Sequence, residues 1–112
     1  MARPLDTEVL ARARALVANP DTWTQGATAR DARGRRVEPE DDEAVRFCLI
    51  GALHRACAEV VAPLGVYNRA SARLEAASFA LGKRGAVSIV NDTEGHAGAL
   101  ALIDAAIQQE KG

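Results

Sequence analysis

The sequence AVRFCLIGAL, residues 44–53, is the apolar centre of this chain. Pro39 and the acidic residues at positions 40–43 precede it, and both are well placed in the first turn of a helix. On a helical wheel the apolar residues that follow fall on two faces, Val45, Leu49, Ala52, Leu53, Ala56 and Val60 on one and Phe47, Ile50, Cys57 and Val61 on the other. A helix that is apolar on two sides is contacted from both. We therefore predict a central helix that begins near residue 40 and ends at Pro63.

Helical spacing of apolar residues predicts three more helices. One pattern covers residues 5–17 and stops before Pro20, and another covers residues 67–81 and stops at Gly82. Residues 87–90 alternate in polarity and predict a short strand or extended segment. The Asn91-Asp92-Thr93 sequence that follows consists of N-cap residue types, which predicts a last helix beginning there.

The segment of residues 21–38 has a different character. Trp23, Thr24 and Thr28 favour extended backbone, Arg33-Gly34 is typical of a turn, and residues 35–37 can return as a partner strand. The predicted fold class is therefore mainly α: a four-helix domain with a small β-hairpin or ordered loop between helices 1 and 2.

Composition agrees with this prediction. Alanine, the best helix former and a poor strand former, occupies 24 of the 112 positions. The length is close to the most common domain size, so residues 1–112 are expected to form a single small helical domain.

Charge and cysteine content narrow the function classes. The formal net charge is −1, which gives no overall field that attracts nucleic acid. Cys48 and Cys57 would lie about 13 Å apart on the predicted helix, too far for a disulfide. The sequence has no signal-like segment and no apolar run long enough to span a membrane. We therefore expect a cytoplasmic protein with no membrane partner.

Cys48 is the candidate nucleophile, because the dipole at a helix start lowers the pKa of a thiol. Catalysis by cysteine also needs a base and an orienting group, and His96 with Asn91 or Asp92 could supply them. The alternative is that Cys48 only packs in the core and that Asn91-Asp92 only caps a helix.

A metal site would have to combine Cys48, Cys57, His54 and His96. His54 and Cys57 share a helix face, but the short Cys-x-x-Cys pairing of structural zinc sites is missing. We predict neither a metal nor another cofactor.

Candidate binding residues gather in and near the predicted hairpin. Arg30, Arg35 and Arg36, with Arg33, form a basic patch that could hold phosphates, and Trp23 could stack beside it. Gln25 and Phe47 complete the set. Asp31 interrupts the patch and five acidic residues follow it, so a charge-balanced tip, with Trp23 as a packing anchor, is the competing interpretation.

Several of these elements occur together in a known pattern. Trp23-x-Gln25-Gly26, then Arg46-Phe47-Cys48-x-x-Gly51-Ala52-Leu53, then Asn91-Asp92, resemble a family of small uncharacterised bacterial and phage-encoded domains. The resemblance covers most of the chain, with Val90 where a tryptophan is expected. It implies the layout of the chain and no activity.

Within this layout Gly51 stands in a predicted helix, where glycine costs about 1 kcal/mol relative to alanine. Close approach of another backbone explains such a glycine, and the partner could be the hairpin or residues 87–92. Gln25, Asn91 and Asp92 could then hydrogen-bond around Cys48, as a buried polar network or as the floor of a small pocket.

Three functions are consistent with these observations. The first is a protein-binding or accessory module that recognises a partner, or itself as a homodimer, through an alanine-rich helix face. The second is a small cysteine-dependent hydrolase or transferase that uses Cys48. The third is weak nucleic-acid binding through residues 30–36.

Overall fold

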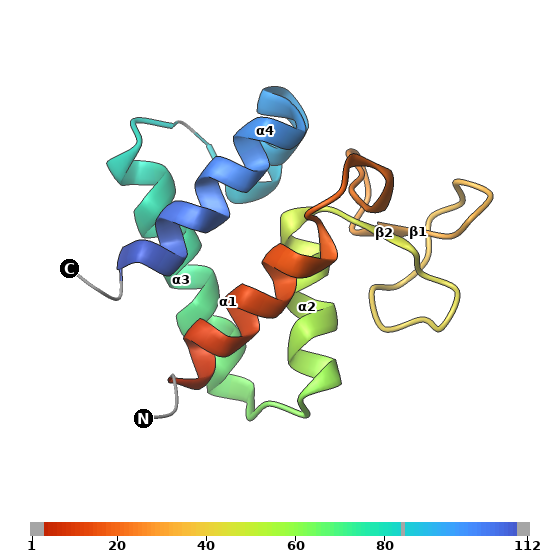
Figure 1. Ribbon diagram of the computed structural model, residues 1–112, viewed down its shortest axis with the longest axis horizontal. Coiled ribbons are helices and arrows are strands. Elements are labelled where there is room, and N and C mark those ends of the chain that lie inside the picture. The colour runs from red at the N-terminus through yellow and green to blue at the C-terminus, as the bar shows by residue number, and fades with distance from the viewer. Residues whose placement is uncertain (1–3, 84, 110–112) are drawn as a thin grey trace.

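The computed structural model describes residues 4–83 and 85–109. The elements, in chain order, are α1 (Leu5–Leu16), a 3-10 turn η1 (Pro20–Thr22), β1 (Ala29–Arg30), β2 (Arg46–Phe47), α2 (Leu49–Glu59), α3 (Leu64–Ala80) and α4 (Val87–Gln108). Figure 1 shows the four helices packed together, with the two short strands and their loops projecting to one side. The predicted fold class, four helices with a small β-hairpin between the first two, is confirmed.

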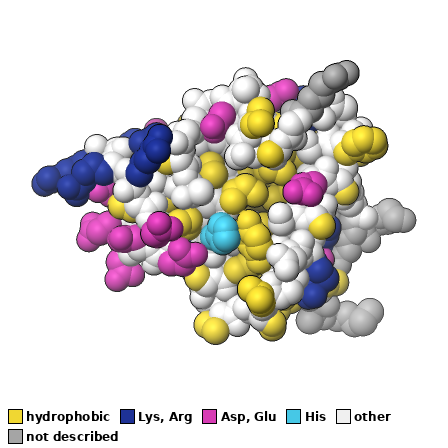
Figure 2. All heavy atoms as spheres, turned by 180° about the vertical axis from the view of Figure 1, so that it is seen from behind, with side chains coloured by type: hydrophobic (Ala, Val, Ile, Leu, Met, Phe, Trp, Pro, Cys, Tyr) yellow, Lys and Arg dark blue, Asp and Glu magenta, His cyan; other side chains and the backbone are white. Residues whose placement is uncertain are grey.

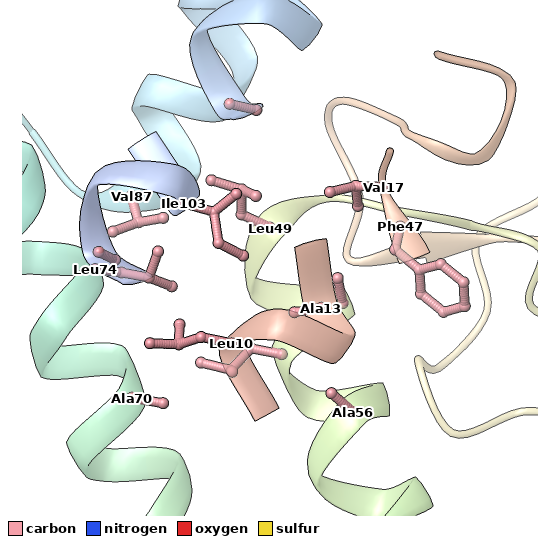
Figure 3. Close-up of a cluster of buried hydrophobic side chains, with 14 of the residues drawn as sticks. Leu10, Ala13, Val17, Phe47, Leu49, Ala56, Ala70, Leu74, Val87 and Ile103 are labelled. Carbon is pink, nitrogen blue, oxygen red and sulfur yellow. The ribbon is translucent and has the colours of Figure 1, made fainter. Parts of the chain in front are cut away.

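The core lies where the four helices meet. Leu10 of α1, Leu49 of α2, Leu74 of α3 and Ile103 of α4 have no solvent exposure and converge in its centre (Figure 3). Small buried residues, Ala13, Ala52, Ala56, Ala70, Ala77, Ala99 and Ala106 among them, line the helix contacts. Because alanine side chains are short, they let helix backbones approach closely and close a core that has few large residues.

The strand β1 has hydrogen-bonded neighbours on both edges. On one edge it pairs antiparallel with β2, Ala29 opposite Phe47 and Arg30 opposite Arg46. On the other edge a tight turn with positive φ at Gly34 brings residues 35–37 back, with bonds from Val37 N to Ala29 O and from Asp31 N to Arg35 O. The predicted return of residues 35–37 is therefore present, but the partner in the regular ladder is β2.

The predicted start of the central helix near residue 40 is wrong, because α2 begins at Leu49. Residues 39–43 form turns, in which the side chain of Asp41 accepts a hydrogen bond from Glu43 N. Arg46 and Phe47 are extended because their backbone pairs with β1. Pairing with residues 29–30, which lie outside the range of local helical contacts, has overridden the local helical pattern.

The predicted extended segment of residues 87–90 is also wrong, because α4 begins at Val87. Val87 and Val90 are both buried, and a spacing of three places them on one helix face. Asn91 and Asp92 therefore lie inside the helix rather than at its N-cap. Gly95, with φ 77° and ψ −175°, interrupts the helical backbone shortly after them.

None of the helices in the described part of the chain is both long enough and apolar enough to cross a membrane.

Candidate functional site

Asn91 is the centre of a polar cluster at the N-terminus of α2. Its side chain has no solvent exposure. The Oδ1 atom accepts hydrogen bonds from Trp23 Nε1 at 2.8 Å and from Leu49 N at 3.1 Å. The Nδ2 atom donates to Thr24 O and to Asp92 Oδ1, both at 3.1 Å. All four hydrogen-bonding positions of the amide are used, so Asn91 joins α4, α2 and the segment after η1.

Gln25 and Asp92 extend the same cluster toward the surface. Gln25 Nε2 donates to Asp92 O at 2.8 Å, and Gly26 N donates to Asp92 Oδ1 at 3.1 Å. The Gln25-Gly26 loop is therefore attached to α4 by both its side chain and its backbone. These contacts bring together the Trp-x-Gln-Gly and Asn-Asp motifs.

Cys48 is the N-cap residue of α2, and its Sγ accepts a hydrogen bond from Gly51 N at 3.3 Å. Its side chain is buried, and it lines a pocket of about 400 Å³ together with Thr28, Ser88 and Asp92. Burial raises the pKa of the Cys48 thiol, and the negative charge of Asp92 raises it further, against the opposing effect of the Gly51 N–H. At neutral pH the group is therefore a thiol, whereas nucleophilic catalysis requires the thiolate.

Gly51 lies directly against the segment that leads into β1. A Cβ atom at this position would fall 1.7 Å from the carbonyl oxygen of Thr28. The same oxygen accepts a hydrogen bond from Cys48 N. The prediction that another backbone approaches Gly51 is confirmed, and the partner belongs to the hairpin side rather than to residues 87–92.

His96 does not face Cys48 but contacts Val17 and Trp23. Its Nε2 lies 2.7 Å from Val17 O and donates to it, since a carbonyl only accepts. Its ring centroid lies 5.5 Å from that of Trp23, at an interplanar angle of 59°. His96 is not among the residues that line the Cys48 pocket. Of the four predicted catalytic residues, Cys48 and Asp92 share a pocket and Asn91 is bonded beside them.

The predicted basic patch is held largely by contacts within the chain. Arg30 donates from Nε to Thr24 Oγ1, from Nη1 to Gly34 O and from Nη2 to Gln25 O. Its guanidinium thus ties the turn to the Gln25 loop. Arg36 lines a surface pocket together with Glu38 and Asp41.

Asp31 organises the tip of the hairpin. Its Oδ1 accepts from the backbone N–H groups of Arg33 and Arg35, and its Oδ2 pairs with Arg35 Nε at 2.8 Å. The N–H of Arg35 is the largest of the effects that hold the pKa of Asp31 below its usual value. Figure 2 shows basic side chains at this end of the molecule with acidic side chains next to them, as the charge-balanced interpretation requires.

Phe47 is buried, and the guanidinium of Arg55 lies 5.8 Å from the centre of its ring. Arg55 also donates to the carbonyl oxygens of Pro39 and Asp41, and so fastens the acidic loop to α2. Phe47 therefore anchors the strand pair from the inside of the fold.

Sequence reasoning missed an apolar groove between the end of α2 and the start of α3. We call it the α2–α3 groove. It measures about 370 Å³, and its lining residues are Glu40, His54, Cys57, Ala58, Val61, Ala62, Pro63, Leu64 and Tyr67. The rings of His54 and Tyr67 are stacked inside it, 4.2 Å apart at 18°. Val61 and Leu64 are each 86% exposed.

The signal for this groove was present in the sequence. Residues 60–62, in the turn between α2 and α3, are apolar where polar residues are usual, and Leu64, the first residue of α3, is apolar as well. Figure 2 shows a band of hydrophobic side chains across this face, with a histidine beside it and acidic side chains next to the histidine. An apolar surface in such a turn is a feature of interaction sites.

Cys57 and His54 share the α2–α3 groove, as their spacing suggested. Burial raises the pKa of the Cys57 thiol. Within residues 4–83 and 85–109, no group of three or more His, Cys, Asp and Glu side chains is arranged to hold a metal ion.

Comparison with known proteins places the chain in a family. The chain belongs to the Family of unknown function (DUF6197), whose sequence pattern matches residues 1–109. This confirms the resemblance at the level of an uncharacterised family, while its proposed motifs and its bacterial and phage distribution stay a prediction. No curated protein and no solved structure matches the chain.

Proposed function

We propose that this protein is a non-enzymatic binding module that docks an amphipathic helix with basic residues, supplied by a partner protein, into the α2–α3 groove. The observation that carries this proposal is the exposure of Val61 and Leu64, two large aliphatic side chains that stand 86% exposed at an apolar pocket. Burying such side chains against a partner contributes about 1.5–3 kcal/mol each.

The size of the groove favours side chains as its occupants. A pocket of about 370 Å³ is small against a whole helix, but it can receive the apolar anchors that a helix presents at positions i, i+3 and i+4. His54 and Tyr67 form a flat, stacked wall on which such anchors can pack.

The charge beside the groove favours a basic partner. Glu40 lines the groove, and Glu38, Asp41, Asp42 and Glu43 belong to the same exposed loop. Residues 38–43 contain no basic residue. An amphipathic helix with lysine or arginine at the edge of its apolar face would complement both surfaces, and a helix with acidic residues there would be repelled.

The state of Cys48 supports binding over the alternative of a hydrolase or transferase. The thiol is buried, and burial and Asp92 both raise its pKa. It serves as a hydrogen-bond acceptor at the start of α2 instead. The arginines of residues 30–36 give little support to nucleic-acid binding, since Arg30 and Arg35 are engaged within the hairpin.

Fluorescence anisotropy with a labelled helical peptide made only of leucine and lysine, in an amphipathic pattern, tests the proposal. We expect binding that weakens with salt, and an affinity reduced at least about 10-fold in the Val61→Ser, Leu64→Ser double variant. Ile89→Ser, at a side chain 51% exposed on α4, is the matched control and should bind as the parent protein does.

A second peptide, with glutamate in place of every lysine, tests the charge argument. It should bind at least about 10-fold more weakly, and Glu40→Lys should narrow the difference. Absence of binding by the leucine–lysine peptide, equal loss in the Ile89 control, or equal affinity for both peptides would overturn the proposal.

A further inference from the structure

The end of α3 and the start of α4 form a small pocket, which we call the α3–α4 pocket. Its volume is about 290 Å³, and Glu75, Ser78, Lys83 and Val87 are among the residues that line it. It shares no lining residue with the α2–α3 groove or with the Cys48 pocket. The α3–α4 pocket is therefore a separate feature of the molecule.

The two helix ends at this pocket differ in how their backbone groups are paired. At the end of α3, Lys83 N donates to Ser78 O, and φ is 75° at Gly82. This is a Schellman arrangement, which pairs the C-terminal carbonyl groups of a helix. At the start of α4, neither Val87 N nor Ser88 N donates a hydrogen bond to any residue that the structure describes. The N-terminus of α4 therefore keeps free donors together with the positive end of the helix dipole.

Ser78 carries a buried hydroxyl group with no partner. The residue is 4% exposed, and its Oγ is the one buried side-chain polar atom in the described part of the chain that makes no hydrogen bond. A serine inside a helix often bonds back to the carbonyl oxygen four positions earlier, here that of Leu74, but Ser78 does not. An unpaired buried hydroxyl destabilises a fold. A ligand in the pocket would supply the partner that the chain does not.

Lys83 adds a cationic donor to the pocket. Its Nζ pairs with Glu94 Oε1 at 2.6 Å, which occupies one of the three N–H donors of the ammonium group. Glu75 also lines the pocket, is exposed, and takes part in none of the ion pairs found among residues 4–83 and 85–109. The positive charge of Lys83 is thus balanced nearby, and the other donors are neutral N–H and O–H groups. Such a set favours an anion with one negative charge over an anion with two.

We propose that the α3–α4 pocket binds a carboxylate group, with Ser78 Oγ, Lys83 Nζ and the first N–H groups of α4 as its donors. A carboxylate accepts hydrogen bonds at both of its oxygens, so it can use several of these donors at once. Its single negative charge is attracted by the N-terminus of α4. A doubly charged anion such as sulfate is repelled more strongly by Glu75 and Glu94.

This inference goes beyond the proposed function and does not depend on it. The two sites share no residue, and the carboxylate is tested with no peptide present. Either proposal can therefore fail alone.

Titration of the isotope-labelled protein with sodium acetate, followed by the chemical shifts of the backbone amides, tests the proposal. Sodium chloride keeps the ionic strength constant, so that a change in screening does not contribute to the shifts. We expect saturable shifts centred on Ala86 and Val87, with a dissociation constant of about 1–20 mM because acetate has few atoms. Sulfate at the same ionic strength should bind at least about 5-fold more weakly.

Two serine variants test whether the buried hydroxyl takes part. Ser78→Ala should weaken acetate binding at least about 5-fold, since it removes a donor. In chloride alone this variant should resist urea at least as well as the parent protein, because the hydroxyl that it removes is unpaired. Ser71→Ala, the same change about two turns earlier on α3 and outside the pocket, is the matched control and should leave the affinity unchanged.

Two charge variants test the electrostatic argument. Lys83→Gln should weaken acetate binding at least about 5-fold. Glu75→Gln should strengthen sulfate binding more than acetate binding, and so narrow the difference between the two anions.

The source of the carboxylate is tested with N-acetylglycine, which presents the carboxylate of a protein chain end. Binding at least about 5-fold tighter than that of acetate assigns the pocket to a chain end, whereas equal or weaker binding assigns it to a small acid. Absence of saturable shifts with both compounds, an unchanged affinity in Ser78→Ala, or an equal loss in Ser71→Ala would overturn the proposal.

Discussion

Trp23 donates its indole N–H to the side-chain oxygen of Asn91 at 2.8 Å, although the two residues are 68 positions apart in the sequence. The same oxygen receives the backbone N–H of Leu49, the first residue of α2. One buried amide therefore fixes the position of the only tryptophan and supplies a partner for one of the unpaired N–H groups at a helix start. The fold is held together at this point by polar contacts as well as by its apolar core.

Replacement of Asn91 by alanine should be among the most destabilising single changes. It leaves the indole N–H of Trp23 and the N–H of Leu49 without their acceptor, and each unpaired buried group costs about 1–3 kcal/mol. We expect the free energy of unfolding in urea, followed by Trp23 fluorescence, to fall by about 3 kcal/mol. Gln108→Ala, at an exposed position of α4, is the control and should change it by less than about 0.5 kcal/mol. Equal effects of the two changes would show that the cluster does not stabilise the fold.

Alanine at position 51 should destabilise the protein although alanine favours helix. Its Cβ would lie 1.7 Å from the carbonyl oxygen of Thr28, which is backbone and cannot rotate away. We expect a loss of at least about 3 kcal/mol in urea denaturation.

Gly65→Ala is the matched control for Gly51→Ala. There the nearest atom to the new Cβ, at 3.2 Å, is the end of the flexible Arg69 side chain. This change should leave the free energy of unfolding unaltered or raise it by up to about 1 kcal/mol. Stabilisation by Gly51→Ala as well would contradict the close approach of the two backbones.

The Cys48 thiol should react slowly with iodoacetamide. A raised pKa means less thiolate at any given pH, and burial also hinders access. In a Cys57→Ser variant, which leaves a single thiol, we expect the rate of alkylation at pH 7 to be at least about 10-fold lower than in the urea-unfolded chain. Mass spectrometry of timed samples measures both rates. Faster alkylation in the folded protein than in the unfolded chain would support the alternative of a cysteine-dependent hydrolase or transferase.

Stability should depend on Asp31 in acid. Its pKa is lowered in the folded state, so ionised Asp31 favours folding at pH values above its unfolded pKa of about 4. That contribution is lost as the pH falls through the lower, folded value. Asp31→Asn should therefore lower the melting temperature at pH 7, and the difference from the parent should shrink as the pH falls below about 4. Asp42→Asn, in the exposed acidic loop, is the control, and a pH-independent effect of Asp31→Asn would refute the argument.

The helices were predictable where a regular apolar pattern extends over several turns. The patterns of residues 5–17 and 67–81 gave α1 and α3 nearly at their observed bounds, because a repeated stripe is buried in any helical packing. Residues 44–48 were not predictable in the same way. Their apolar character fits both a helix and a strand, and pairing with β1 decided between the two.

The candidate sites, like the helices, were predictable from the sequence only in part. The close backbone approach at Gly51 followed from the residue type, since a helical glycine needs a reason. The α2–α3 groove could not be predicted in this way, because it exists only where the end of α2 and the start of α3 meet in space. The sequence showed only that the region of Val61 and Leu64 is unusually apolar.

The sequence by itself determined a helical chain, the approximate limits of α1 and α3 and the residues able to form polar contacts. Tertiary structure alone decided what those residues do. Asn91 is a residue type that favours a helix N-cap in its own segment, yet it lies inside α4. Its side chain instead accepts the N–H of Leu49, the first residue of α2, and the indole N–H of Trp23. Local propensity is measured over a few neighbouring residues, whereas a buried amide takes its partners from whichever segments the core brings to it. The physical reason is that a buried polar group without a hydrogen-bond partner costs free energy, and that partner can come from any segment that lies nearby in space.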